Sequence, residues 1–135
     1  MEKTLLVLKP DAVKRGLCGE ILARFERRGF QIAAIKSLTV SRELAEKHYA
    51  EHAQKPFFAG LVEFITGAPS VALILESPDA IALSRQMIGA TNPLQAATGT
   101  IRGDLTNDKQ FNLIHGSDSP EAAQREIALW FPEAA

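Results

Sequence analysis

Thr4-Leu5-Leu6-Val7-Leu8, stopped at once by Lys9-Pro10, is the stretch from which the fold can be worked out. A short apolar run that ends at a proline is typical of a buried strand. A similar run returns at Val71-Ala72-Leu73-Ile74-Leu75. We expect strands at 4–8, 30–40 and 71–75, and a short last strand at 112–115 closed by Gly116.

Helical segments separate these strands. From Val13 to Arg28 the apolar residues fall on one face, and Gly29 is a plausible C-terminal cap. Ser41 and Ser119 can cap the N-termini of later helices. The remaining expectations are a helix over 58–65, a helix started by Ser77-Pro78-Asp79 and carrying Ile81, Leu83 and Ile88, and a long loop over 90–111.

The order is strand, helix, strand, helices, strand, helix, loop, strand, helix, which indicates a sheet covered by helices. We predict an α/β fold of the α+β sandwich type. Its arrangement is ferredoxin-like βαββαβ, with a four-stranded antiparallel sheet covered by helices. The 135 residues, 46% of them hydrophobic and 23% charged, fit a single domain over 1–135.

The composition excludes several classes of protein. A net charge of -1 does not indicate long-range attraction to nucleic acid or to an anionic membrane. Cys18 is the only cysteine, so an intramolecular disulfide is excluded. No apolar stretch approaches the ~20 residues that span a bilayer, and the first apolar run is too short for a signal peptide. We expect a soluble, cytoplasmic protein.

The most informative segment for chemistry is Asn112-Leu113-Ile114-His115-Gly116-Ser117-Asp118-Ser119. A histidine at a strand end, followed by glycine, places an imidazole at an accessible edge. A neutral imidazole can act as a covalent nucleophile if its other ring nitrogen has a partner that fixes the tautomer. Glu126 and Ser117 are the candidates for that partner. Neither a G-x-x-x-x-G-K-[ST] loop nor a G-x-G-x-x-G fingerprint is present to hold phosphates.

The segment from Asn112 to Ser119 spells N-x-x-H-G-S-D-S and resembles the active-site signature of nucleoside diphosphate kinases. Four further motifs match that family in order and spacing, so the similarity covers essentially the whole chain. They are Lys9-Pro10-Asp11, His48–His52 followed by Lys55-Pro56-Phe57-Phe58, Gly89-Ala90-Thr91-Asn92-Pro93, and Gly99-Thr100-Ile101-Arg102-Gly103-Asp104.

The resemblance implies a ping-pong transfer of the γ-phosphoryl group of a nucleoside triphosphate, typically ATP, to a nucleoside diphosphate. His115 would accept the group, Glu126 would hold the imidazole with support from Ser117, and Tyr49 would lie near the transferring group. Other residues would bind the nucleotide: Lys9, Arg85, Thr91 and Arg102 the phosphates, Asn112 and Lys9 the ribose, and Phe57 the base. Mg²⁺ would bridge the phosphates without protein ligands, and stacking on one phenylalanine tolerates any base.

Three positions depart from the family pattern. Leu105 stands where phenylalanine is usual, Lys109 where an aliphatic residue commonly covers the base, and Thr98 where many members have a proline. The family assembles from a common dimer into tetramers or hexamers. Because Thr98 frees the loop backbone and the chain ends soon after Phe131, we expect a homo-tetramer rather than a hexamer or a dimer.

Two other functions fit parts of the sequence. His48-x-x-Glu51-His52 matches the H-x-x-E-H pattern of inverted zinc peptidases, in which two histidines share a helical face. A ferredoxin-like module could also bind a nucleotide, a nucleic acid or a partner without catalysis. Its RNA-binding form exposes aromatic residues on the sheet, whereas the strands here are aliphatic. The combination of His115, Glu126 and Lys9 favours an enzyme.

Overall fold

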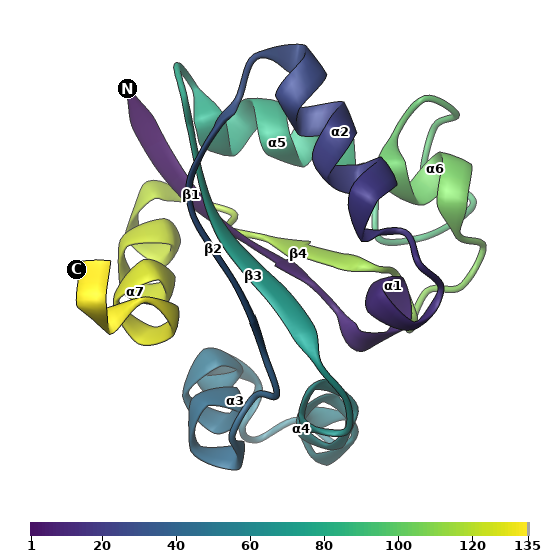
Figure 1. Cartoon of the computed structure of the whole chain (residues 1–135). Helices are drawn as coiled ribbons and strands as arrows, with labels where there is room; N and C mark the ends of the chain where they lie inside the picture. The colour runs from purple at the N-terminus through teal and green to yellow at the C-terminus, as the bar shows by residue number, and fades with distance from the viewer. Residues whose placement is uncertain (135) are drawn as a thin grey trace.

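The computed structural model describes residues 1–134, in which four strands form one sheet in the order β2-β3-β1-β4 (Figure 1). Every neighbouring pair is antiparallel. The strands are β1 (Glu2–Leu8), β2 (Gln31–Leu38), β3 (Ser70–Ser77) and β4 (Ile114–Gly116). This order confirms the predicted ferredoxin-like sandwich, and the antiparallel pairing places it in the α+β class.

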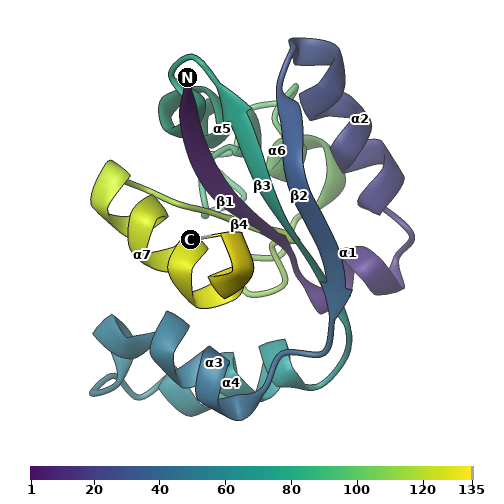
Figure 2. The ribbon, with the colours of Figure 1, turned by 60° about the vertical axis from the view of Figure 1, so that its left-hand side comes forward.

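Helices cover both faces of the sheet (Figures 1 and 2). None of the helices within residues 1–134 has both the length and the apolar character that spanning a bilayer requires. They are α1 (Pro10–Lys14), α2 (Cys18–Arg28), α3 (Arg42–His48), α4 (Phe58–Thr66), α5 (Ala80–Ile88), α6 (Ile101–Leu105) and α7 (Pro120–Trp130), with short 3-10 helices η1 (Ala50–His52) and η2 (Pro132–Ala134).

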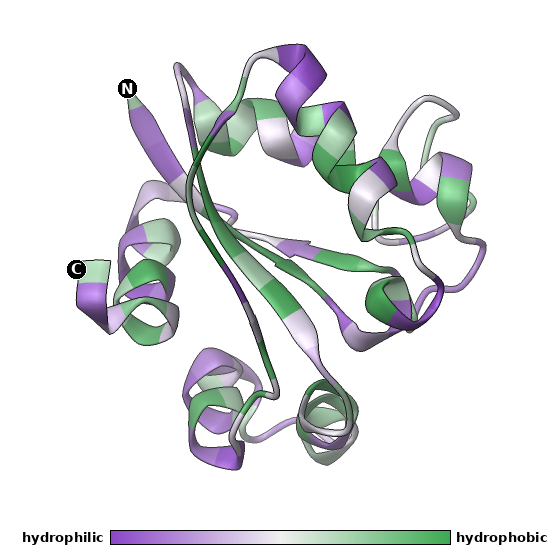
Figure 3. Ribbon diagram, viewed as in Figure 1, coloured by the Kyte–Doolittle hydropathy of each residue, from purple (hydrophilic) through white to green (hydrophobic). Residues whose placement is uncertain are grey.

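The two faces of β1 support two separate cores. Leu6 and Leu8 pack in a buried cluster with residues of α2 and α5. Leu5 and Val7 point to the opposite face and pack with residues of α3, α4 and α7. Because successive side chains of a strand alternate between faces, a continuous apolar run is what a sheet buried on both sides requires. Hydrophobic residues accordingly run along the central strands (Figure 3).

Helix ends set by neighbouring residues agree with the sequence. The hydroxyls of Ser41 and Ser119 accept hydrogen bonds from Leu44 N and Ala122 N, both at 3.1 Å. Gly29 ends α2 with a left-handed φ of 108°. These predictions are confirmed because each depends on chemistry within one turn of the chain.

The helix expected over 13–28 is instead two helices. Proline starts α1 at Pro10, and α1 ends at Lys14. Gly16 then takes a φ of 70°, a left-handed conformation that glycine adopts without steric cost and that stops the first helix. The apolar stripe that suggested one long helix therefore belongs to α2 alone.

The start of α5 also differs from the prediction. Ser77 is the last residue of β3 rather than a cap, and its hydroxyl donates to the carbonyl of Pro78. Asp79 precedes the helix with a φ of 52° and makes no side-chain capping bond. The carboxylate of Glu2, on β1, accepts the hydrogen bond from Ile81 N at 2.9 Å instead. A distant acidic residue thus complements this helix end.

The 90–111 segment is not wholly a loop, because α6 lies within it. Thr100 caps α6 by accepting a hydrogen bond from Gly103 N at 3.0 Å. The last strand begins only at Ile114, two residues later than expected. Leu113 has a φ of 75°, which no strand residue adopts, and this conformation delays the strand.

Candidate active site

His115 lies on the short edge strand β4, opposite Val7 of β1. Its side chain is 23% exposed and borders a cavity of about 170 Å³. Pairing with β1 continues beyond the strand, where Ser117 N donates to Leu5 O at 3.1 Å. The sheet therefore fixes the backbone on both sides of the histidine while its imidazole stays accessible. The cavity is lined by His48, Tyr49, Glu51, His52, Arg85, His115, Gly116, Asp118 and Glu126.

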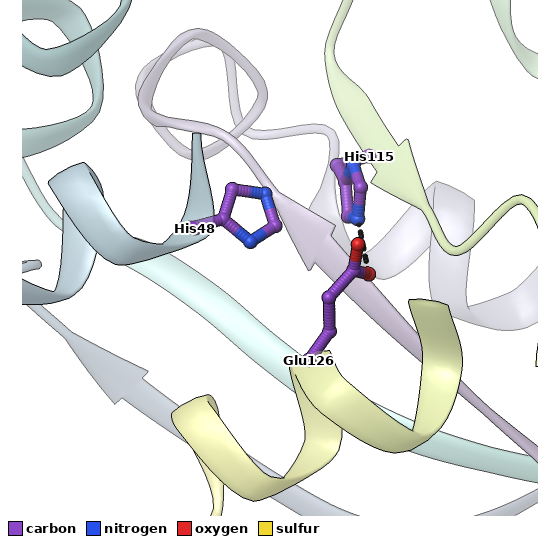
Figure 4. A group of neighbouring side chains, drawn as sticks. All are labelled: His48, His115 and Glu126. Atoms are coloured by element: carbon purple, nitrogen blue, oxygen red, sulfur yellow. Dashed lines mark hydrogen bonds and ion pairs between the residues drawn. The ribbon is translucent and has the colours of Figure 1, made fainter. Parts of the chain in front are cut away.

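Glu126 of α7 holds one nitrogen of the His115 ring (Figure 4). Its Oε1 lies 2.8 Å from His115 Nε2 and accepts a second hydrogen bond from the Ser117 hydroxyl at 2.7 Å. Burial by itself would raise the pKa of Glu126, but the hydrogen bonds from His115 and Ser117 bring it below its usual value. In the neutral ring, a carboxylate at Nε2 makes that nitrogen the donor and leaves the lone pair on Nδ1.

The sequence did not reveal that His48 is a neighbour of His115. Its ring meets the His115 ring edge to face, with centroids 4.5 Å apart and planes at 81°. Trp130 Nε1 donates to His48 Nδ1 at 3.0 Å. Burial, followed by the charge of His115, lowers the pKa of His48 to about 3, so this ring is neutral. No short-range pattern joins residues 48, 115 and 130.

The zinc-peptidase alternative is not supported by the geometry. His48 ends α3, whereas His52 lies in η1, so the two do not share one helical face. Within residues 1–134, the group with metal-ligand spacing is His48, His115 and Glu126, with ligand atoms within 4.8 Å of one another. Metal-bound histidines usually donate their second N–H to an acceptor. Nδ1 of His48 accepts a bond instead, which leaves the proton on Nε2.

Lys9 follows β1 and meets Asn112 across the site. Its Nζ donates to Asn112 Oδ1 at 3.0 Å. Burial, and next the charge of Arg102, lower the pKa of Lys9 from 10.5 to about 8. The structure therefore brings the predicted phosphate lysine and the predicted ribose residue into contact.

Arg102 is 6% exposed and directs most of its donors at the backbone. It bonds Asn112 O at 3.2 Å, Ile114 O at 2.6 Å and Gly89 O at 3.1 Å, and reaches the Thr91 hydroxyl at 3.4 Å. Of its five N–H groups, one on Nη2 has no partner among these contacts. Burial and the charge of Arg85 lower the pKa of Arg102 to about 10. Arg102 therefore organises the loops around His115.

Tyr49 and Arg85 line the cavity beside His115, whereas Phe57 lies outside it. Tyr49 lines the cavity half-buried, and burial, with Glu126, raises the pKa of its hydroxyl to about 12. Arg85 is exposed and donates to Gly116 O at 3.2 Å. Phe57 is 49% exposed outside the cavity and contacts the His52 ring at 5.4 Å between centroids. An exposed aromatic face suits a nucleobase that arrives from solvent.

The sequence profile of a family described as nucleoside diphosphate kinase matches residues 2–135. The chain belongs to this family. The predicted resemblance is thus confirmed along nearly the whole chain. A nucleoside diphosphate kinase of Nocardia farcinica is 61% identical over 98% of this chain and 96% of its own length. One from Thermus thermophilus is 60% identical over 97% of this chain and 96% of its own.

Solved structures of the family have the same fold. A halophilic nucleoside diphosphate kinase from Halobacterium salinarum, in complex with CDP, is 51% identical and superposes with a TM-score of 0.93, covering 96% of this chain and 87% of its own. A family protein from Babesia bovis is 48% identical, with a TM-score of 0.95 over 98% of this chain and 90% of its own.

The three departures from the nucleoside diphosphate kinase pattern lie away from the bonds around His115. Leu105 packs against the core cluster that contains α2 and α5, as an apolar exchange allows. Lys109 is exposed, and its carbonyl accepts a hydrogen bond from the Asn112 amide at 3.0 Å. Thr98 is exposed in the loop before α6.

Proposed function

We propose that the chain is a nucleoside diphosphate kinase that transfers the γ-phosphoryl group of a nucleoside triphosphate through a phosphohistidine at His115. One observation carries the proposal: Glu126 engages Nε2 of His115 at 2.8 Å and leaves Nδ1 as the nucleophilic nitrogen. Membership of the family and relatives at about 60% identity support the same reaction.

The transfer proceeds in two displacements at phosphorus. The Nδ1 lone pair of His115 forms a bond to the γ-phosphorus as the bond to the bridging oxygen breaks, and the nucleoside diphosphate leaves with that electron pair. A second nucleoside diphosphate then attacks the phosphorus of the phosphohistidine through an oxygen of its terminal phosphate, and the bond from phosphorus to Nδ1 breaks with its electron pair returning to the ring. Glu126 stabilises the positive charge that the ring gains in the first step. Positioning and charge stabilisation supply most of the catalysis in such reactions.

The donors for the nucleotide come from several elements. We assign the phosphates to Lys9, Arg85, Thr91 and the free N–H of Arg102, since phosphoryl oxygens need cationic or hydroxyl donors. The contact between Lys9 and Asn112 places two polar groups where the ribose hydroxyls would bind. Phe57 offers an exposed face for stacking, which any base can use.

The divalent cation that the reaction needs is proposed to be Mg²⁺ carried on the nucleotide. When bound, it neutralises phosphate charge. Mg²⁺ takes oxygen ligands and retains several waters. Within residues 1–134 the group with metal-ligand spacing has two imidazoles and one carboxylate, a set that suits zinc better. These residues are a poor set of ligands for Mg²⁺, which agrees with a Mg²⁺ ion held by the phosphates and by water.

The mechanism is tested by incubating the protein with γ-labelled ATP and Mg²⁺. We expect label on the protein that is lost in acid, kept in alkali and released by any nucleoside diphosphate. His115→Ala should abolish labelling and turnover, whereas the matched control His52→Ala should still be labelled. An acid-stable label, or transfer by His115→Ala, would contradict the proposal.

We also propose that the protein is a cytoplasmic homo-tetramer. Thr98 is exposed where a proline would stiffen the loop, which weakens the argument for a hexamer. A single free cysteine, Cys18, suits a compartment that keeps thiols reduced. Light scattering at micromolar protein tests the assembly, and a mass of six chains would contradict it. Cell fractionation tests the location.

A further inference from the structure

A strained turn immediately precedes the nucleophile. Leu113 has a φ of 75°, and Ile114 N donates to Asn112 O at 2.9 Å, two residues back. This is the pattern of the γ-turn with positive φ, the rarer and more strained of the two γ-turn types. Leu113 is fully buried and carries a bulky side chain, for which a positive φ is sterically unfavourable, unlike for glycine. Contacts elsewhere must hold it.

Residues 9–11 supply those contacts on both sides of Leu113. Lys9 N donates to Leu113 O at 2.8 Å, and Leu113 N donates to Asp11 Oδ2 at 3.0 Å. The second bond is made by a carboxylate, and hydrogen bonds to charged groups are roughly twice as strong as neutral ones. Asp11 Oδ1 is buried and has no partner within residues 1–134. Leu113 N is therefore the hydrogen-bond donor to this carboxylate among the described residues. The charge of Asp11 also acts on Lys9 and Arg102, where it opposes the lowering of each pKa by burial.

The turn determines where the site residues on either side of it lie. Asn112, just before Leu113, presents its amide oxygen to Lys9. Arg102 bonds the carbonyls of Asn112 and Ile114, one on each side of the turn. His115 follows directly in β4. A relaxed, extended Leu113 would rotate these groups relative to one another.

We propose that Asp11 is a positioning residue for phosphoryl transfer, and that its carboxylate holds the strained turn that aligns Asn112 and His115. The proposal rests on the phosphohistidine mechanism above. It goes beyond that mechanism because the rate of transfer then depends on a residue that contacts neither the nucleophile nor the phosphates.

The test compares Asp11→Ala and Asp11→Asn with the native protein in single-turnover labelling by γ-labelled ATP. Misplaced reacting groups can cost up to about a hundredfold in rate, so we expect Asp11→Ala to slow labelling at saturating ATP by about ten- to a hundredfold. The ATP concentration at half-saturation should change less. Asp11→Asn keeps an acceptor oxygen for Leu113 N and should recover most of the rate.

Asp108→Ala is the matched control. Asp108 also bonds backbone N–H groups, those of Gln110 and Phe111 at 2.8 and 3.0 Å, but it does not contact Leu113. We expect this variant to retain the native saturating rate. Unfolding midpoints separate loss of fold from loss of alignment. A native saturating rate in Asp11→Ala, or an Asp11→Asn as slow as Asp11→Ala, would overturn the proposal, whereas absence of label in the native protein would overturn the proposed function.

Discussion

Trp130 donates its indole N–H to His48 Nδ1 at 3.0 Å, and this bond decides which nitrogen of His48 carries the proton. Because Nδ1 accepts, the proton of the neutral ring lies on Nε2. The same ring packs edge to face against His115 (Figure 4). His48 and His115 have the spacing of two metal ligands, but the Nε2 of His48 carries a proton and therefore has no lone pair to offer a metal ion.

Trp130→Phe is expected to make phosphoryl labelling of His115 more sensitive to inhibition by Zn²⁺. Without the indole donor, His48 can carry its proton on Nδ1 and offer Nε2 beside His115 and Glu126, where the ligand atoms lie within 4.8 Å of one another. Outer-shell partners change metal affinity by about ten- to a hundredfold. We expect Zn²⁺ to inhibit labelling of Trp130→Phe at a concentration lower by about that factor than for the native protein.

The control for this prediction is the double variant with Trp130→Phe and His48→Gln. It should lose the added sensitivity, because glutamine cannot replace an imidazole ligand for zinc. Inhibition should be measured relative to the uninhibited rate of each variant. Equal zinc sensitivity of Trp130→Phe and the native protein would show that the tautomer of His48 does not prevent zinc from binding at this site.

The buried His48 should also make stability depend on pH. Burial, with the charge of His115, lowers its pKa from 6.5 to about 3 in the folded protein, so between these values the unfolded chain binds the extra proton. The stabilising contribution is complete above pH 6.5 and is lost as the pH falls toward 3. Its steepest slope is about 1.4 kcal/mol per pH unit.

Urea unfolding from pH 7 to pH 4 measures this effect. Carboxylates also titrate in acid, so the relevant quantity is the difference between the native protein and His48→Gln. We expect the free energy of unfolding to fall more steeply with decreasing pH in the native protein. Parallel curves for the two proteins would show that His48 is not held neutral by the fold.

Sequence-based prediction worked in this protein where the determining contacts are local. Ser41, Ser119 and Gly29 end helices through bonds to residues within one turn, and all three were anticipated. The start of α5 was missed because its partner, Glu2, is 79 positions away along the chain. A pattern along the sequence cannot reveal such a contact.

The candidate site shows the same division. The resemblance to the family supplied His115, Glu126 and Ser117, which the structure brings within hydrogen-bond distance. It did not reveal that Arg102 donates most of its hydrogen bonds to backbone carbonyls. Nor did it reveal that Asp11 accepts a hydrogen bond from Leu113 N, where Leu113 has a positive φ. Those features depend on loop geometry that residue types alone do not determine.

The lowered pKa of Lys9 predicts that activity declines in alkali. Burial and the charge of Arg102 bring the pKa of Lys9 to about 8, so the ammonium loses its proton as the pH rises through that value. Phosphate binding then loses a charged donor. We expect kcat/KM for ATP, which reports the free enzyme, to fall above about pH 8. Lys9→Met should have a lower kcat/KM that does not change over this range, and a native profile that stays level to pH 9.5 would argue against the assignment.

Gly103→Ala is expected to destabilise the protein and slow the reaction together. A Cβ at Gly103 would overlap the carbonyl of Ala97 and lie 2.7 Å from the Thr100 hydroxyl, so backbone would have to move. Forcing extra atoms into a packed site usually costs about 1–3 kcal/mol. Because Arg102 precedes this glycine and donates hydrogen bonds to the carbonyls of Asn112 and Ile114, the displacement should also reduce turnover.

The matched control is Gly60→Ala in α4, where a Cβ meets nothing within 4 Å. Alanine favours helix over glycine, so Gly60→Ala should gain about 0.5–1 kcal/mol in the free energy of unfolding. Urea unfolding and steady-state assays of both variants check this pair, and a Gly103→Ala protein as stable as Gly60→Ala would contradict the close approach of α6 to Ala97.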